Sequence, residues 1–165
     1  MTQSVTLVIR PATADDAGLL LQLIREFAEY VQMLNIVVAT DERLRQTLFG
    51  SRPCADVLLA YLGQEPVGFA VFFSTYSTFL GQPGMYLEDL FVRPAARGKG
   101  IGRALLARVA KIATDRGCGR LEWSALDWNE SAIGFYLGLG AEAKEDSTVY
   151  RLLGEPLSRL ATASS

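Results

Sequence analysis

Histidine is absent from this sequence of 165 residues. It is the commonest general base near neutral pH and belongs to the usual serine and cysteine triads and zinc sites. Its absence excludes those arrangements here. Any proton transfer by this chain must therefore use carboxylates, tyrosine, lysine, cysteine or water.

Cysteine, net charge and long apolar runs are also scarce. Cys54 and Cys118 are too few for a disulfide framework or a metal site, so we expect no metal and two buried, reduced thiols. A net charge of −2 indicates neither a nucleic-acid nor a membrane partner. No apolar run approaches the roughly 20 residues of a membrane span, and no signal peptide is recognisable at the start. We therefore expect a cytoplasmic protein.

Hydrophobic residues, in contrast, make up 50% of the chain. This content predicts one domain over residues 1–165, with its core at about 5–153. Apolar periodicity predicts strands at 5–10, 57–62, 67–75, 85–92, 121–126 and 148–153, and helices at 19–30, 40–50, 100–116, 129–139 and 155–161. This order predicts an α+β fold in which an antiparallel meander is followed by a strand–helix–strand crossing into a parallel pair.

The most informative segment is the glycine-rich loop Arg97–Gly102, which leads from an apolar strand into a helix. Its three glycines allow a tight turn and leave backbone N–H groups unobstructed. The positive end of the following helix favours a bound phosphate, and Arg97 and Lys99 add positive charge. The loop is therefore predicted to bind a pyrophosphate.

Two familiar phosphate loops do not fit this segment. A Walker loop needs serine or threonine after its lysine, whereas Lys99 precedes Gly100. In a dinucleotide fingerprint the third glycine comes one residue later than it does here. On residues alone, the remaining alternative is a glycine-rich helix start without a ligand.

The loop and the preceding Val92-Arg93-Pro94 resemble the acetyl-CoA loop of the GNAT superfamily of N-acetyltransferases. A second block, Asp127–Ala141, resembles the Asn-x-x-Ala…Phe-Tyr…Gly-Ala signature of the same superfamily. Tyr76–Gly81 and Tyr86–Leu90 narrow the resemblance to the branch of diamine (spermidine/spermine) and thialysine N-acetyltransferases. The resemblance implies the GNAT fold, with a mixed sheet, a splayed parallel pair and flanking helices. It also implies acetyl-CoA as cosubstrate, a small-molecule primary amine as acceptor and a homodimer.

The resemblance further implies roles for individual residues. Tyr136 matches the general acid, and Glu88 matches the carboxylate that orients or deprotonates the amine through water. The implied cosubstrate contacts are Leu90, Phe91, Val92, Arg97, Gly98, Lys99, Gly100, Ile101, Gly102, Arg103, Asn129, Ser131, Ala132 and Tyr136. The implied amine contacts are Tyr30, Glu88, Asp89, Glu122, Trp123 and Ser124.

The implied reaction is direct attack of a neutral amine on the thioester in a ternary complex. A primary amine with a pKa near 10.4 is neutral in about 1 in 2,500 molecules at pH 7, so a proton acceptor is needed. Tyrosine protonates a thiolate of pKa near 8.5 at a cost of about 2 kcal/mol, far less than water. A backbone N–H where the strand 88–92 bends is expected to stabilise the oxyanion.

Several of these residues also fit plain structural roles. Tyr136 shares a helix face with apolar residues and fits a packing role, and Asn129 suits a helix cap without any ligand. Adjacent strand residues point to opposite faces unless the strand is bulged. We therefore expect Glu88 to face the active site and Asp89 to be structural or to lie at a subunit boundary.

Two positions bear on the acceptor. The branch usually carries an acid where Val31 stands, and polyamine acetylators carry one at the position of Ser77. With both anions missing, we prefer a small amine such as a lysine analogue over spermine. A non-catalytic acyl-CoA-binding regulatory domain, or the same chemistry on a protein or peptide amine, remains an alternative.

Overall fold

The computed structural model describes residues 5–163. The chain divides into two compact units, which meet in sequence between Ser124 and Ala125. Within residues 5–163 no helix is long and apolar enough to cross a membrane. The expectation of a single domain stays a prediction.

The first unit is built on one five-stranded sheet. Four strands form an antiparallel meander, and the fifth pairs with the fourth in parallel. The strands, in their spatial order, are β1 (Leu7–Pro11), β2 (Asp56–Leu62), β3 (Glu65–Ser77), β4 (Gln82–Val92) and β5 (Leu121–Trp123). This arrangement confirms the predicted mixed sheet.

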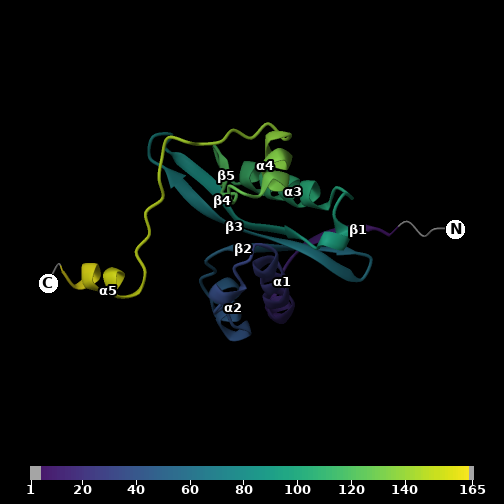
Figure 1. The fold of residues 1–165 in the computed structure, drawn as a ribbon, viewed down its shortest axis with the longest axis horizontal. Coiled ribbons are helices and arrows are strands. Elements are labelled where there is room, and N and C mark those ends of the chain that lie inside the picture. Colours follow the sequence, from purple (N-terminus) through teal and green to yellow (C-terminus); the bar gives the residue numbers. More distant parts are fainter. Residues whose placement is uncertain (1–4, 164–165) are drawn as a thin grey trace. The chain divides into compact units, whose positions relative to one another are not determined.

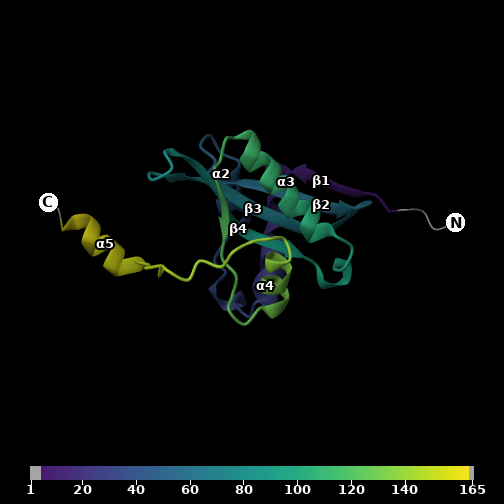
Figure 2. The ribbon, with the colours of Figure 1, turned by 90° about the horizontal axis from the view of Figure 1, so that it is seen from above.

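Helices cover both faces of this sheet. The helices α1 (Ala17–Tyr30) and α2 (Asp41–Leu48) lie on one face, and α3 (Ile101–Asp115) lies on the other (Figures 1 and 2). Three short 3₁₀ helices, η1 (Ala14–Asp16), η2 (Leu34–Ile36) and η3 (Pro94–Ala96), lie in the connections of this unit. The helix α2 begins where predicted because the Thr40 hydroxyl accepts the Arg43 N–H at 3.2 Å.

A hydrophobic core fixes α1 over the sheet. Leu20 and Leu23, three residues apart on one face of α1, are fully buried in a cluster with Phe69 and Phe91. The ring of Phe27 lies 5.6 Å from that of Phe91 between centroids. Each large side chain buried in this way contributes about 1.5–3 kcal/mol, so the position of α1 over β3 and β4 is firmly determined.

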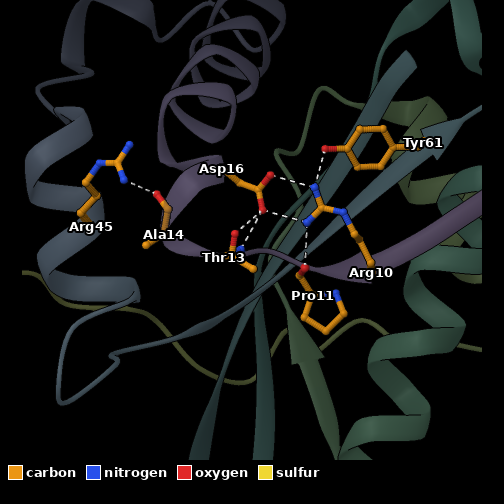
Figure 3. A network of polar contacts seen from close by, with 7 residues as sticks. All are labelled: Arg10, Pro11, Thr13, Ala14, Asp16, Arg45 and Tyr61. Carbon is orange, nitrogen blue, oxygen red and sulfur yellow. Dashed lines mark hydrogen bonds and ion pairs between the residues drawn. The ribbon is translucent and has the colours of Figure 1, made fainter. Parts of the chain in front are cut away.

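A polar network joins the first strand to the start of α1 (Figure 3). Arg10 donates to both carboxylate oxygens of Asp16 at 2.8 Å and to the Tyr61 hydroxyl at 2.9 Å. The Thr13 N–H also donates to Asp16, at 2.7 Å. Hydrogen bonding from Arg10 lowers the pKa of Asp16 to about 2. The network therefore ties β1, β2 and the beginning of α1 together.

Several predicted boundaries, and the predicted burial of both cysteines, differ from the structure. The loop predicted at 76–84 is mostly strand, because β3 and β4 pair as far as Ser77 and Gln82. The strand predicted at 121–126 ends at Trp123. The prediction that Cys54 is buried is wrong: it lies exposed in the turn after α2, where its N–H donates to the Thr47 carbonyl. Cys118 is partly exposed.

The second unit contains the helices α4 (Glu130–Leu137) and α5 (Gly154–Thr162), both predicted. The prediction of a strand at 148–153 is wrong, because that segment has no regular secondary structure. A strand requires hydrogen bonds to a neighbouring strand, and residues 125–163 contain no strand that could pair with it. Val149 and Tyr150 are accordingly 85% and 92% exposed.

We predict that Asp16→Asn lowers the free energy of unfolding at pH 7 by about 1–2 kcal/mol. Because the folded pKa of Asp16 is depressed, its contribution is present above the unfolded pKa and is lost as pH falls through about 2. Urea unfolding should therefore give a wild-type–variant difference that shrinks between pH 4 and pH 2. The control is Asp115→Asn, which removes an exposed ion pair to Lys111 and should change little. An equal loss at pH 7 and pH 2 would contradict this role of Asp16.

Candidate active site

An extra residue interrupts the regular pairing of β4. Asp89 lies opposite Val71, but Leu87, not Glu88, lies opposite Phe72. Glu88 is thus the additional residue of a β-bulge, and the alternation of faces shifts there by one position. A bulge at this position is what would allow Glu88 and Asp89, although adjacent, to point toward the same side of the strand.

The bulge gathers polar residues on the α1 face of the sheet. Asp89 shares that face with Phe91 and with its partner Val71, both of which pack in the core beneath α1. Tyr86 lies opposite Phe73, two residues after Val71, and the two rings are 5.4 Å apart. Tyr86 and Asp89, three residues apart, therefore lie on one face, which a regular strand does not permit.

Asp89 occupies an unusual electrostatic environment. Its side chain is half-buried, whereas Glu88 is exposed. Burial, and secondly the negative charge of Glu88, raises the pKa of Asp89 to about 6. A carboxylate of this kind binds a cation well and accepts a proton more readily than an ordinary aspartate.

The fifth strand contributes a second set of predicted residues. Glu122 lies beside Tyr86 in the parallel register, and the hydroxyls of Tyr86 and Ser124 are 2.6 Å apart. Glu122 also pairs with Arg120 at 2.8 Å. Trp123 lies beside Leu87, on the opposite face of the sheet, so it is separated from Glu122 and Ser124. In the sequence Tyr86 belongs only to a motif, but its register places it on the same face as Asp89 and makes it a further candidate site residue.

The last residue of α1 brings an aromatic ring close to this face. The centroid of the Tyr30 ring is 6.5 Å from that of Phe91 and 4.1 Å from the Arg97 guanidinium carbon. The next residue, Val31, is 8% exposed and belongs to the core. The position at which the related branch carries an acid is thus apolar and buried.

The glycine-rich loop has the conformation predicted for a phosphate site. Gly98 and Gly100 have φ angles of +75° and +77°, which side chains rarely adopt, and Gly100 is the N-cap of α3. Arg97, Lys99 and Arg103 are exposed, and none of them forms an ion pair within residues 5–163. The helix start therefore combines orphan N–H donors with uncompensated positive charge.

The edge of β4 that faces β5 is partly open. The two strands pair only between Met85–Leu87 and Leu121–Trp123. Beyond the bulge, no strand of the described chain pairs with that edge of Glu88–Val92. The backbone of Leu90 and Val92 is therefore suited to an extended ligand lying alongside as an added strand.

The second unit holds the remaining predicted residues. The Asn129 side-chain oxygen accepts the Ala132 N–H at 3.2 Å, as a helix cap does. Ser131 is exposed, while Tyr136 is half-buried with its ring centroid 5.3 Å from that of Phe135. Burial raises the pKa of Tyr136. The grouping of these residues with those of β4 stays a prediction.

Residues 21–141 match the model of the acetyltransferase (GNAT) family. The chain belongs to this family. It is 37% identical to a thialysine N-epsilon-acetyltransferase of Bos taurus, over 93% of this chain and 96% of the relative. It is 32% identical to an L-ornithine N5-acetyltransferase of Arabidopsis thaliana, over 92% and 86% of the two chains.

A solved structure agrees with these relatives. An integron cassette protein from the mobile metagenome of V. cholerae superposes with a TM-score of 0.80 at 28% identity, covering 95% of this chain and 98% of that chain. The predicted fold and the predicted branch of the GNAT family, with thialysine and spermidine/spermine acetyltransferases, are thus confirmed. This GNAT protein is an N-acetyltransferase.

GNAT enzymes use acetyl-CoA as cosubstrate, and the donors described above fit it. The loop Arg97–Arg103 offers backbone N–H groups and cationic side chains suited to a diphosphate. The open edge of β4 offers alternating donors and acceptors suited to the amides of the pantetheine arm.

We predict that Asp89→Asn stabilises this GNAT enzyme at pH 8. The folded pKa of Asp89 is about 6, so wild-type stability falls as pH rises from about 4 to 6 and the cost persists above. The variant should gain about 2 kcal/mol at pH 8 and almost nothing at pH 4. The control Asp146→Asn, in an ion pair more than 70% exposed, should be neutral at both. Thermal unfolding in which Asp89→Asn is destabilised at pH 8 would refute the proposed environment.

Proposed function

We propose that this GNAT enzyme transfers the acetyl group of acetyl-CoA to a primary amine of a small molecule. The acceptor is a thialysine- or lysine-like amino acid or a diamine, and it attacks directly in a ternary complex. The observation that carries the proposal is the bulge at Glu88, which gathers Asp89 and Tyr86 on one face beside the open edge of β4. The names of the two relatives, which act on thialysine and ornithine, support this acceptor class.

Carboxylates on the bulge attract the ammonium form of the acceptor. Glu88 is exposed and Asp89 half-buried, so together they offer both an entry point and a less solvated binding point. The other amino groups of a long polyamine find no acidic side chain at the two positions where polyamine acetylators carry one. Val31 is buried, and the Ser77 hydroxyl accepts the Leu80 N–H at 3.2 Å within the β3–β4 turn. This favours a short acceptor.

Asp89 also eases the deprotonation that attack requires. Moving a proton from an amine of pKa about 10.4 to an ordinary aspartate costs about 9 kcal/mol. With the pKa of Asp89 at about 6, the same transfer costs about 6 kcal/mol. We infer that the proton leaves the amine for this pair of carboxylates, directly or through water, and that Glu88 helps to orient the amine.

Tyr136 is proposed as the group that protonates the departing thiolate. Burial raises its pKa, so this donation is more uphill than the roughly 2 kcal/mol of an ordinary tyrosine. Water, at a pKa of about 15.7, is still a much poorer donor. The proposed homodimer and the expected cytoplasmic location stay predictions.

The test is an acetylation panel read by thiol release from acetyl-CoA. Thialysine, lysine, ornithine and putrescine should be acetylated with a higher kcat/KM than spermidine, spermine or a lysine-containing peptide. Thiol release with the peptide but with none of the small amines would indicate that the acceptor is a protein. Tight coenzyme A binding in calorimetry without turnover of any amine would instead favour a regulatory domain.

We expect Tyr136→Phe to lower kcat by about 100-fold, as loss of a general acid does, with little change in the KM for acetyl-CoA. The matched control is Tyr150→Phe, because Tyr150 is 92% exposed and the substitution removes the same hydroxyl. Steady-state kinetics with the preferred amine distinguishes them. Equal kcat values for both variants would remove Tyr136 from the mechanism.

A further inference from the structure

Arg97, the first residue of the glycine-rich loop, stacks on the ring of Tyr30, the last residue of α1. The Arg97 guanidinium carbon lies 4.1 Å from the centroid of the Tyr30 ring and 5.9 Å from that of Phe91. Its Nε donates to the Val92 carbonyl at 2.9 Å. Arg97 is thus held by a ring face and by one backbone acceptor, at the point where β4 leads into the loop.

Stacking leaves most of this arginine free for an anion. A guanidinium on an aromatic ring uses its flat face, whereas its N–H groups donate within the plane. The hydrogen bond to the Val92 carbonyl occupies Nε, and Arg97 has no carboxylate partner within residues 5–163. Its terminal nitrogens can therefore donate to a phosphate without the side chain leaving Tyr30.

The last turn of α1, which carries this ring, is itself anchored to the sheet. One turn earlier on α1, Glu26 accepts two hydrogen bonds from Arg93, at 2.7 and 2.8 Å. Arg93 also donates to the Pro66 carbonyl at 2.6 Å. Glu26 and Tyr30, four residues apart on α1, thus contact Arg93 and Arg97, which are also four residues apart. The end of α1 and the segment between β4 and the glycine-rich loop therefore support each other.

We propose that Tyr30 is a positioning residue for Arg97 and, through it, for the diphosphate of the cosubstrate. An unsupported arginine has many rotamers and loses that freedom on binding, whereas the ring fixes the guanidinium beforehand. The inference rests on the proposed use of acetyl-CoA. It gives the end of α1, expected to line the amine pocket, a second role in cosubstrate affinity.

The test is a double-mutant cycle on coenzyme A binding, measured by calorimetry without an acceptor amine. Tyr30→Leu should weaken binding about 3- to 10-fold, the cost of ordering one freed arginine side chain on binding, and Tyr30→Phe should weaken it less because it keeps the ring. Arg97→Ala should weaken binding more. In the Arg97→Ala background, Tyr30→Leu should have no further effect, because its role passes through Arg97.

Lys99 supplies the matched control. It lies in the same loop, but Arg97 and not Lys99 stacks on Tyr30, so Tyr30→Leu and Lys99→Ala should weaken binding by independent factors that multiply. A purely structural effect of Tyr30→Leu would appear equally in both backgrounds and would overturn the inference. Should Tyr30→Leu lower the unfolding temperature into the measuring range, Tyr30→Met replaces it in the same cycle.

The outcomes separate this inference from the proposed function. If the wild type binds coenzyme A and acetylates amines but Tyr30→Leu leaves affinity unchanged, only the positioning role fails. If the wild type does not bind coenzyme A, the proposed function fails and the positioning role fails with it.

Discussion

One additional residue in β4 determines what the first unit presents on its α1 face. In a regular strand, Tyr86 and Asp89 would point to opposite sides of the sheet, and only one of them would lie on the α1 face. Glu88 takes up the extra position and shifts the alternation. The bulge thus leaves the Asp89 carboxylate half-buried and beside the negative charge of Glu88. Both effects raise the pKa of Asp89.

The glycine-rich loop depends on the same support. The strand that carries the bulge leads directly into the loop, and α1 packs over both through Phe91 and the Glu26–Arg93 pair. The carboxylates proposed to bind the amine and the loop proposed to bind the diphosphate are therefore attached to one rigid element of the first unit. Such shared support keeps reacting groups in register, which proximity catalysis requires.

Local patterns made most of the fold predictable. The helical spacing of α1, the Thr40 cap and the strand–loop–helix around Gly100 each depend on neighbours in sequence. Features that depend on pairing were less predictable, since a bend in the strand 88–92 was expected but the position of the additional residue was not. The bulge at Glu88 is visible only in the register with β3, the face of Trp123 follows from its partner in β4, and the strand predicted at 148–153 has no pairing strand within residues 125–163.

The most direct test of the central claim is an NMR titration of the Asp89 side-chain carboxyl carbon in the folded enzyme. The bulge and the burial it imposes predict a pKa of about 6, which should fall when the neighbouring charge is removed by Glu88→Gln. A pKa near 4 that is unaffected by Glu88→Gln would contradict the account.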